Sequence, residues 1–161
     1  MRFNSSNNND LKNLRCTLKK ILNEKSIIVC IGTNRDIADS MAPFVGMILE
    51  ENGCRYKVYG TIDKPVHALN LREFIDEIKT RYPEYIILAI DAGLDESPDS
   101  VGDIILEYKE LNPGSGVGKK LSPIGDLSII GIVGSEKDLY NEEIRLNTVI
   151  KIAKSIASSI L

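Results

Sequence analysis

A chain of 161 residues with 43% hydrophobic and 27% charged residues has the size and composition of one globular domain. Its formal net charge of −3 gives no general attraction to nucleic acid or anionic lipid, so neither is expected as a partner. No apolar run approaches the roughly 20 residues that span a bilayer, and the N-terminus lacks the apolar core of a signal peptide. Three cysteines without a Cys-x-x-Cys pair favour reduced thiols, so a cytoplasmic protein is expected.

In the first half of the chain, strand patterns alternate with helix patterns. Residues 1–10 are mostly polar and rich in Asn and Ser, and they are expected to form a flexible tail before a single domain over 11–161. Apolar spacing then predicts elements in this order: a helix over 10–23, a strand over 27–31, a helix over 40–52, an edge strand over 55–59, a helix over 70–81 and a central strand over 84–90.

This alternation stops after Asp91. The stretch 92–102 has no helical periodicity and is shorter than the dozen or so residues that a parallel crossover usually needs. Strands are expected over 103–108 and 126–133, and Ser135 with Asp138 resembles a capping box that opens a long closing helix. The fold class is therefore α/β, with a mostly parallel but mixed sheet of five strands.

Two aspartates are expected at one edge of this sheet. Asp39 follows the turn after the strand 27–31, and Asp91 follows the strand 84–90. If the first of these strands lies between its two neighbours, a crevice opens at this topological switch point. Close carboxylates can share a proton and activate a water, or they can hold a divalent metal. A purely structural interpretation also stays open, in which Asp39 caps its helix and Asp91 bonds a turn.

Several other motifs lack a residue that their chemistry requires. The glycine-rich stretch 113–120 resembles a phosphate-binding loop, but Pro113 occupies the first glycine position and Lys120 the Ser/Thr position. Ser115 lacks the first glycine of a Gly-x-Ser-x-Gly elbow. With His67 as the one histidine, Ser–His and Cys–His hydrolases and a His/Cys zinc site are disfavoured. His67 is expected either near the site or in a structural role.

Four segments resemble the short YyaC-type sporulation proteins, which are grouped with spore proteases. They are Cys-Ile-Gly-Thr-Asn-Arg-Asp at 30–36, Asp-Ser-Met-Ala-Pro at 39–43, Tyr-Gly-Thr-Ile-Asp-Lys-Pro-Val-His-Ala-Leu-Asn-Leu at 59–71 and Pro-Gly-Ser-Gly-Val-Gly at 113–118. More distantly, parts of them are similar to the spore germination protease and to hydrogenase maturation proteases.

This resemblance implies a three-layer α/β/α sandwich and a cytoplasmic, forespore-associated aspartic-type endopeptidase. It implies that Asp39 and Asp91 are the catalytic pair. No cofactor is expected, and no tightly bound metal, because a carboxylate pair without a cysteine or histidine cluster holds zinc or nickel only weakly. Its substrate would be a protein or peptide, with small acid-soluble spore proteins as candidates. The motifs also supply the expected substrate-binding residues, which are Thr33, Asp36, His67, Gly114, Ser115, Gly116 and Gly118.

The chain departs from these relatives in three respects. Ala42 stands where the family usually has glycine, the chain is much shorter than the germination protease, and the histidine that helps the maturation proteases bind nickel has no clear counterpart. Nickel is therefore disfavoured. The alternative is a non-catalytic sporulation protein that binds a peptide or partner in the same cleft, and the oligomeric state stays open.

Overall fold

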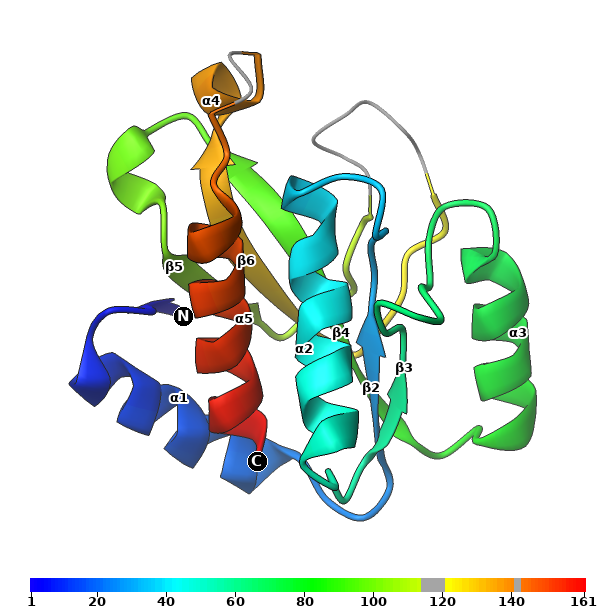
Figure 1. Ribbon diagram of the computed structural model, residues 1–161. Coiled ribbons are helices and arrows are strands. Elements are labelled where there is room, and N and C mark those ends of the chain that lie inside the picture. The colour runs from blue at the N-terminus through cyan, green and yellow to red at the C-terminus, as the bar shows by residue number, and fades with distance from the viewer. Residues whose placement is uncertain (114–120, 141–142) are drawn as a thin grey trace.

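A mixed sheet of six strands forms the centre of the fold and is flanked by helices (Figure 1). The computed structural model describes residues 1–113, 121–140 and 143–161. The strands are β1 (Arg2–Asn4), β2 (Ser26–Cys30), β3 (Lys57–Tyr59), β4 (Ile86–Asp95), β5 (Asp103–Glu107) and β6 (Leu127–Ser135). The helices are α1 (Asn8–Ile21), α2 (Met41–Glu51), α3 (Leu71–Arg81), α4 (Glu136–Tyr140) and α5 (Leu146–Ile160), with short 3-10 turns η1 (Ala38–Ser40) and η2 (Pro98–Ser100).

The strand order is β1-β5-β6-β4-β2-β3. Strands β3, β2, β4 and β6 run parallel, whereas β5 is antiparallel to β6 and β1 is antiparallel to β5. The expectation of a mixed sheet is thus confirmed. The expected central position of β4 is confirmed as well. So is the place of β2 between β3 and β4, and this order creates the expected topological switch point at the end of β2.

The expected number of five strands is wrong, because residues near the N-terminus form a sixth. Arg2–Asn4 pair with β5 in place of the expected flexible tail. Phe3 is buried, and the backbone N–H of Asn4 donates to Asp10 Oδ2 over 2.9 Å. Sequence periodicity could not detect this strand, because a three-residue segment with one apolar side chain has no measurable pattern.

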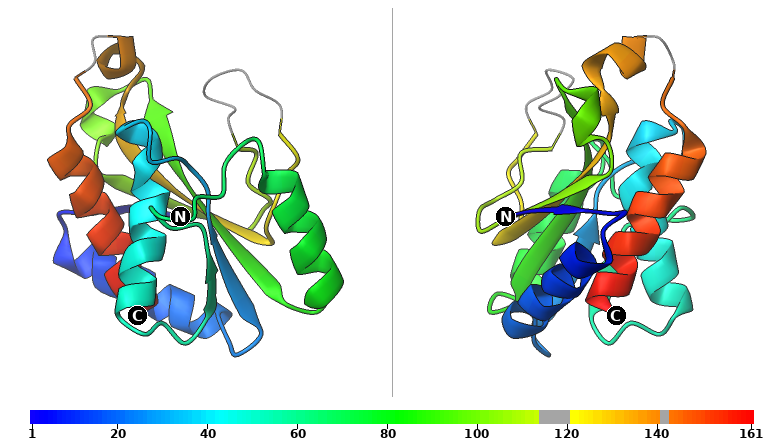
Figure 2. Two further views of the ribbon diagram at one scale, coloured as in Figure 1. Left: turned by 45° about the vertical axis from the view of Figure 1, so that its right-hand side comes forward. Right: turned by 90° about the vertical axis from the view of Figure 1, so that its left-hand side faces the viewer.

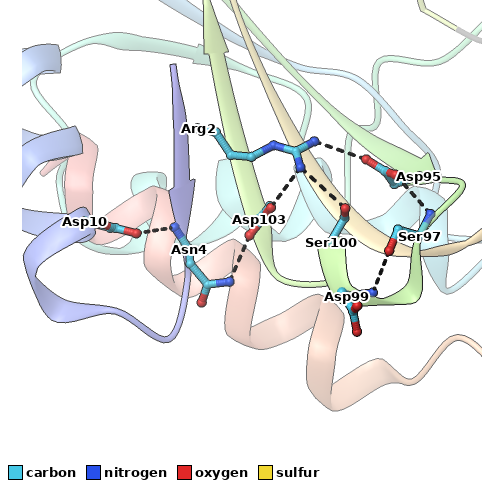
Figure 3. A network of polar contacts seen from close by, with 8 residues as sticks. All are labelled: Arg2, Asn4, Asp10, Asp95, Ser97, Asp99, Ser100 and Asp103. Atoms are coloured by element: carbon cyan, nitrogen blue, oxygen red, sulfur yellow. Dashed lines mark hydrogen bonds and ion pairs between the residues drawn. The ribbon is translucent and has the colours of Figure 1, made fainter.

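Arg2 ties this edge strand to the end of β4 (Figure 3). Its guanidinium lies 3.1 Å from Asp95 Oδ2 and 3.3 Å from Asp103 Oδ2. It also donates to Ser100 Oγ over 3.4 Å. The first strand therefore braces the loop that connects β4 to β5.

The two faces of the sheet carry separate apolar clusters. Along β2, Ile28 and Cys30 contribute to a cluster with α1, α2 and α5, whereas Ile27 and Val29 contribute to a cluster with α3. Since β3 and β4 lie on opposite sides of β2, right-handed crossovers place α2 and α3 on opposite faces. Figure 2 shows α3 separated from α2 and α5 by the strands.

The expected closing helix is divided into α4 and α5. The predicted capping box is present, because Ser135 N–H donates to Asp138 Oδ2 over 2.6 Å and Asp138 N–H donates to Ser135 Oγ over 3.3 Å. However, Arg145 has an extended backbone, with φ −99° and ψ 130°, so α5 begins anew at Leu146. Among the described residues, no helix is both long and apolar enough to cross a membrane.

Helix α2 approaches the sheet so closely that its backbone contacts another backbone. A Cβ added at Gly46 would lie 1.9 Å from the carbonyl oxygen of Gly60, and one added at Gly60 would lie 1.9 Å from the carbonyl oxygen of Cys30. Neither clash can be relieved by turning a side chain. The three backbones therefore fix α2 against the end of β2.

We expect Gly46→Ala to lower the free energy of unfolding by about 2–3 kcal/mol, even though alanine gains about 1 kcal/mol in helix propensity. Denaturant unfolding measures this change. Gly53→Ala is the control, because a Cβ there meets no atom within 4 Å and only the left-handed backbone, with φ +63°, opposes it. A smaller loss for Gly46→Ala than for Gly53→Ala would contradict this account of the packing.

Candidate active-site cleft

A cleft of about 590 Å³ opens beyond the end of β2, beside the last five residues of β4. The chain leaves β2 through α2 on one face of the sheet and enters β4 from α3 on the other, so the connections diverge at this point. The cleft is lined by the loop after β2, the loop after β3, the end of β4 and part of β6. It brings together five of the expected site residues, namely Thr33, Asp36, Asp39, His67 and Asp91.

The other expected site residues, Gly114, Ser115, Gly116 and Gly118, lie outside the described residues. On either side of that gap, Pro113 and Leu121 both line the cleft.

The loop between β2 and η1 folds back over the end of its own strand. The N–H of Gly32 donates to the carbonyl of Val66 over 2.8 Å, and the N–H of Thr33 donates to the carbonyl of Asp39 over 3.1 Å. A Cβ added at Gly32 would lie 2.0 Å from that Asp39 oxygen, so the loop closes only because residue 32 is glycine. Asp36 Oδ1 accepts the N–H of Asp39 over 3.2 Å, which also fixes Asp39 at the mouth of the cleft.

Asp91 lies within β4, because the strand continues well beyond the Ile90 at which the sequence pattern ended it. Pairing with β6 continues from Asp91 opposite Ile130 to Asp95 opposite Ser135. One oxygen of Asp91, Oδ1, accepts the N–H of Ala92 over 2.9 Å. Asp91 therefore does not bond a turn. Nor is Asp39 the N-cap residue of α2, which is Ser40.

The two aspartates have different surroundings. Burial raises the pKa of Asp91 from 3.8 to about 7; the hydrogen bond from Ala92 lowers it, and the nearby charge of Asp39 raises it further. Asp39 itself is exposed to water. Near neutral pH the cleft thus holds a buried carboxyl group whose pKa is close to the ambient pH, together with a second carboxyl group at the surface. Such an unequal pair is typical of acid–base catalysis.

His67 is held by its own loop. Its Nδ1 accepts the N–H of Leu69 over 3.2 Å, and its backbone N–H donates to Asn70 Oδ1 over 2.8 Å. An Nδ1 that accepts carries no proton, which assigns the proton of the neutral ring to Nε2. His67 thus has both roles that the sequence left open, since it stabilises a turn and lines the cleft.

Sequence reasoning missed part of the lining. Arg35 and Asp95 line the cleft, and Leu69 projects from its rim with 90% of its surface exposed. The pKa of Asp95 is lowered by the N–H of Ser97 and by Arg2, opposite in direction to that of Asp91 (Figure 3). The strands under the cleft add apolar side chains, which are Ile105, Ile130 and Ile132. Arg35 and Leu69 lie inside the segments 30–36 and 59–71 that carry the family resemblance, but neither was singled out there. Asp95 and the three isoleucines belong to no such segment, and sheet pairing brings them to the cleft.

Metal-binding side chains do not gather in any part of the chain that the structure describes: no group of three or more His, Cys, Asp or Glu residues there is arranged to hold an ion. Cys16, Cys30 and Cys54 are free thiols.

The fold and the cleft define a mixed α/β protein with an aspartate pair at a topological switch point. The chain belongs to the DUF1256 family, described as "Protein of unknown function", whose profile matches residues 2–159. It is similar to a Bacillus subtilis (strain 168) protein named "Uncharacterized protein YyaC", with 37% identity over 151 residues, covering 91% of this chain and 73% of the relative. The expected likeness to YyaC is thus confirmed. Neither name says whether these proteins are related to proteases.

The raised pKa of Asp91 predicts how stability depends on pH. Between about pH 4 and pH 7 the folded protein binds more protons at Asp91 than the unfolded chain does, so this group destabilises the fold as pH rises. A pKa of about 7 instead of 3.8 corresponds to at most about 4 kcal/mol. Asp91→Asn should therefore be more stable than the parent at pH 8 and similar near pH 4, as measured by urea unfolding.

Asp95→Asn is the control, because the pKa of Asp95 is lowered. Its charged form stabilises the fold at a pH above the ordinary pKa of 3.8, and this contribution is lost as the pH falls. It should be less stable than the parent at pH 8. If Asp91→Asn is no more stable than the parent at pH 8, the account in which burial disfavours the charged form of Asp91 is contradicted.

Proposed function

We propose that this protein is a peptide hydrolase in which Asp39 and Asp91 activate a water for attack on a peptide carbonyl. The observation that carries the proposal is the pKa of Asp91, which burial and the charge of Asp39 raise to about 7 in a cleft that both residues line. A carboxyl group that titrates near neutral pH can give or take a proton under cellular conditions. No cofactor is part of this proposal.

The different surroundings of the two carboxyl groups support a different role for each. Exposed Asp39 is the carboxylate that takes a proton from the attacking water. Protonated Asp91 donates a hydrogen bond to the carbonyl oxygen, and its proton passes to the amide nitrogen as the C–N bond breaks. Asp39 then holds the proton taken from water, so one exchange of protons with solvent restores the pair.

The finer aspects of the family resemblance belong to the same proposal. Helices on both faces of the sheet agree with the α/β/α sandwich of the germination protease and of the hydrogenase maturation proteases. On this basis we infer a cytoplasmic protein of the forespore, with small acid-soluble spore proteins as candidate substrates. The motif at 39–43, which contains Asp39, supports this assignment.

A non-catalytic role is the second candidate, and exposed apolar side chains favour it. Ile37 and Leu69 project from the two loops beside the cleft, with 47% and 90% of their surfaces exposed. Apolar side chains at a rim can bind a partner or a peptide without any chemistry. In that case the cleft would serve a sporulation protein as a peptide-binding groove.

Incubation with extracts of spore proteins, followed by mass spectrometry of new fragments, tests the proposed hydrolase. Asp39→Asn and Asp91→Asn should each reduce the cleavage rate by about 10²–10⁴, because each change removes one proton-transferring group. Asp63→Asn is the matched control, since Asp63 is an exposed aspartate of the loop after β3 that does not line the cleft. It should cleave like the parent.

Cleavage by all three variants at the parent's rate would contradict the aspartate-pair mechanism. A complete absence of cleavage by the parent would favour the binding protein. Activity that is lost to a chelator and restored by nickel or zinc would instead indicate the mechanism of the maturation proteases.

A further inference from the structure

Strand β4 continues past the end of its neighbour β2 (Figure 1). Pairing between the two strands ends with Cys30 opposite Ile90, and the last bond joins the N–H of Ile31 to the carbonyl of Ile90 over 2.8 Å. On its other side, β4 stays paired with β6 as far as Asp95. Within the described part of the chain, the segment Asp91–Asp95 thus has a strand partner on one side only.

The alternation of backbone groups along a strand shows which groups this edge presents. The N–H of Ile86 donates to Lys25 and the carbonyl of Ile90 accepts from Ile31, so the even-numbered residues of β4 face the side of β2. Ala92 continues this series. The register with β6 shifts between Gly93 and Leu94, but the extra residue there is Val133 of β6, so Leu94 continues the series as well. The N–H of Ala92 is bonded to Asp91 Oδ1, which leaves the carbonyl of Ala92 and both backbone groups of Leu94 facing the gap.

This edge borders the cleft. Ala92 and Leu94 line it from β4, while Thr33 and Asp39 line it from the loop after β2. The floor beside the edge is apolar, because Gly93 has no side chain and Cγ2 of Ile130, on the neighbouring strand β6, lies 2.5 Å from where a Cβ of residue 93 would be. An unpaired strand edge beside an apolar floor fits a second extended chain, because its donors and acceptors match the repeat of a strand.

We propose that the cleft binds polypeptide as an extended strand added to the open edge of β4, with its backbone bonded to Ala92 and Leu94. Because paired strands have the same rise of about 3.3 Å per residue, the segment Asp91–Asp95 pairs with about five residues of that chain. An apolar side chain of the added strand packs over Gly93 against Ile130, and the neighbouring peptide bond lies beside Asp91. This inference rests on the proposed function for its substrate class, and it is tested by binding alone.

The test uses full-length Asp91→Asn protein, so that bound peptide is not cleaved, and Asn still offers Oδ1 to the N–H of Ala92. The probes are fluorescein-labelled ten-residue peptides with apolar side chains at alternate positions, and anisotropy reports binding. The tightest peptide is then N-methylated at one position at a time. In an added strand only every second N–H faces β4, so methylation should weaken binding at least about tenfold at alternate positions and little between them.

Uniform sensitivity to methylation, or none, would overturn the added strand. So would the absence of any peptide that binds with a Kd below about 1 mM.

A pair of variants in the same Asp91→Asn background tests the apolar floor. Ile130→Thr should weaken the tightest peptide about tenfold, because it removes apolar surface under the added side chain. Ile86→Thr is the matched control, since Ile86 is also a partly buried isoleucine of the sheet but lies at the opposite end of β4. If the two variants bind this peptide with equal affinity, the contact of the added strand with Ile130 is ruled out.

The outcomes separate this inference from the proposed hydrolase. The parent protein is given the same peptide, and hydrolysis is followed by mass spectrometry. An alternating methylation pattern without hydrolysis supports the added strand and contradicts the hydrolase. Hydrolysis without an alternating pattern supports the hydrolase and overturns the added strand.

Discussion

The close approach of Gly32 to the carbonyl oxygen of Asp39 is the constraint on which the cleft depends. With only 2.0 Å between a Cβ at position 32 and that oxygen, the chain can fold back over β2 only at a glycine. Two features follow from this turn. Asp39 comes to the mouth of the cleft, and β2 ends early enough to leave the far half of β4 without a neighbour on that side among the described residues.

The extended end of β4 carries two aspartates with opposite electrostatic roles. Burial makes the charged form of Asp91 unfavourable, whereas Ser97 and Arg2 stabilise the charged form of Asp95. Arg2 comes from β1, at the far edge of the sheet from β3. The strand β1 thus anchors the end of β4. Asp91, whose charged form is disfavoured by burial, therefore lies on a strand that is held in place at its end.

Much of the fold could be predicted from local patterns. The continuous apolar runs at 27–31 and 84–90 located β2 and the first half of β4, and the short stretch after Asp91 predicted the mixed sheet. The strand β1 could not be predicted, because Phe3 is its one buried side chain and its stability comes from pairing with β5. The length of β4 was underestimated for a similar reason, since pairing with β6 holds a polar segment in the strand.

The candidate site was predictable where a strand end marks it. Asp39 and Asp91 follow apolar runs, so their positions in the sequence were informative. Asp95 and Ile130 were not predictable, because they reach the cleft only through the length and the order of the strands. Leu69 lies two residues after the predicted His67, in the segment 59–71, but nothing in that segment distinguished it. The open edge of β4 was not predictable either, because it exists only where β4 continues beyond the end of its shorter neighbour β2.

The central claim is that burial and the charge of Asp39 together keep Asp91 protonated near neutral pH. NMR titration of the Asp91 carboxyl carbon tests it most directly, in the parent protein and in Asp39→Asn. We expect a midpoint of about 7 in the parent. In Asp39→Asn we expect a lower midpoint that is still above the ordinary value of 3.8, because burial is the larger cause. A parent midpoint near 3.8, or one that Asp39→Asn leaves unchanged, would contradict the paired-aspartate account.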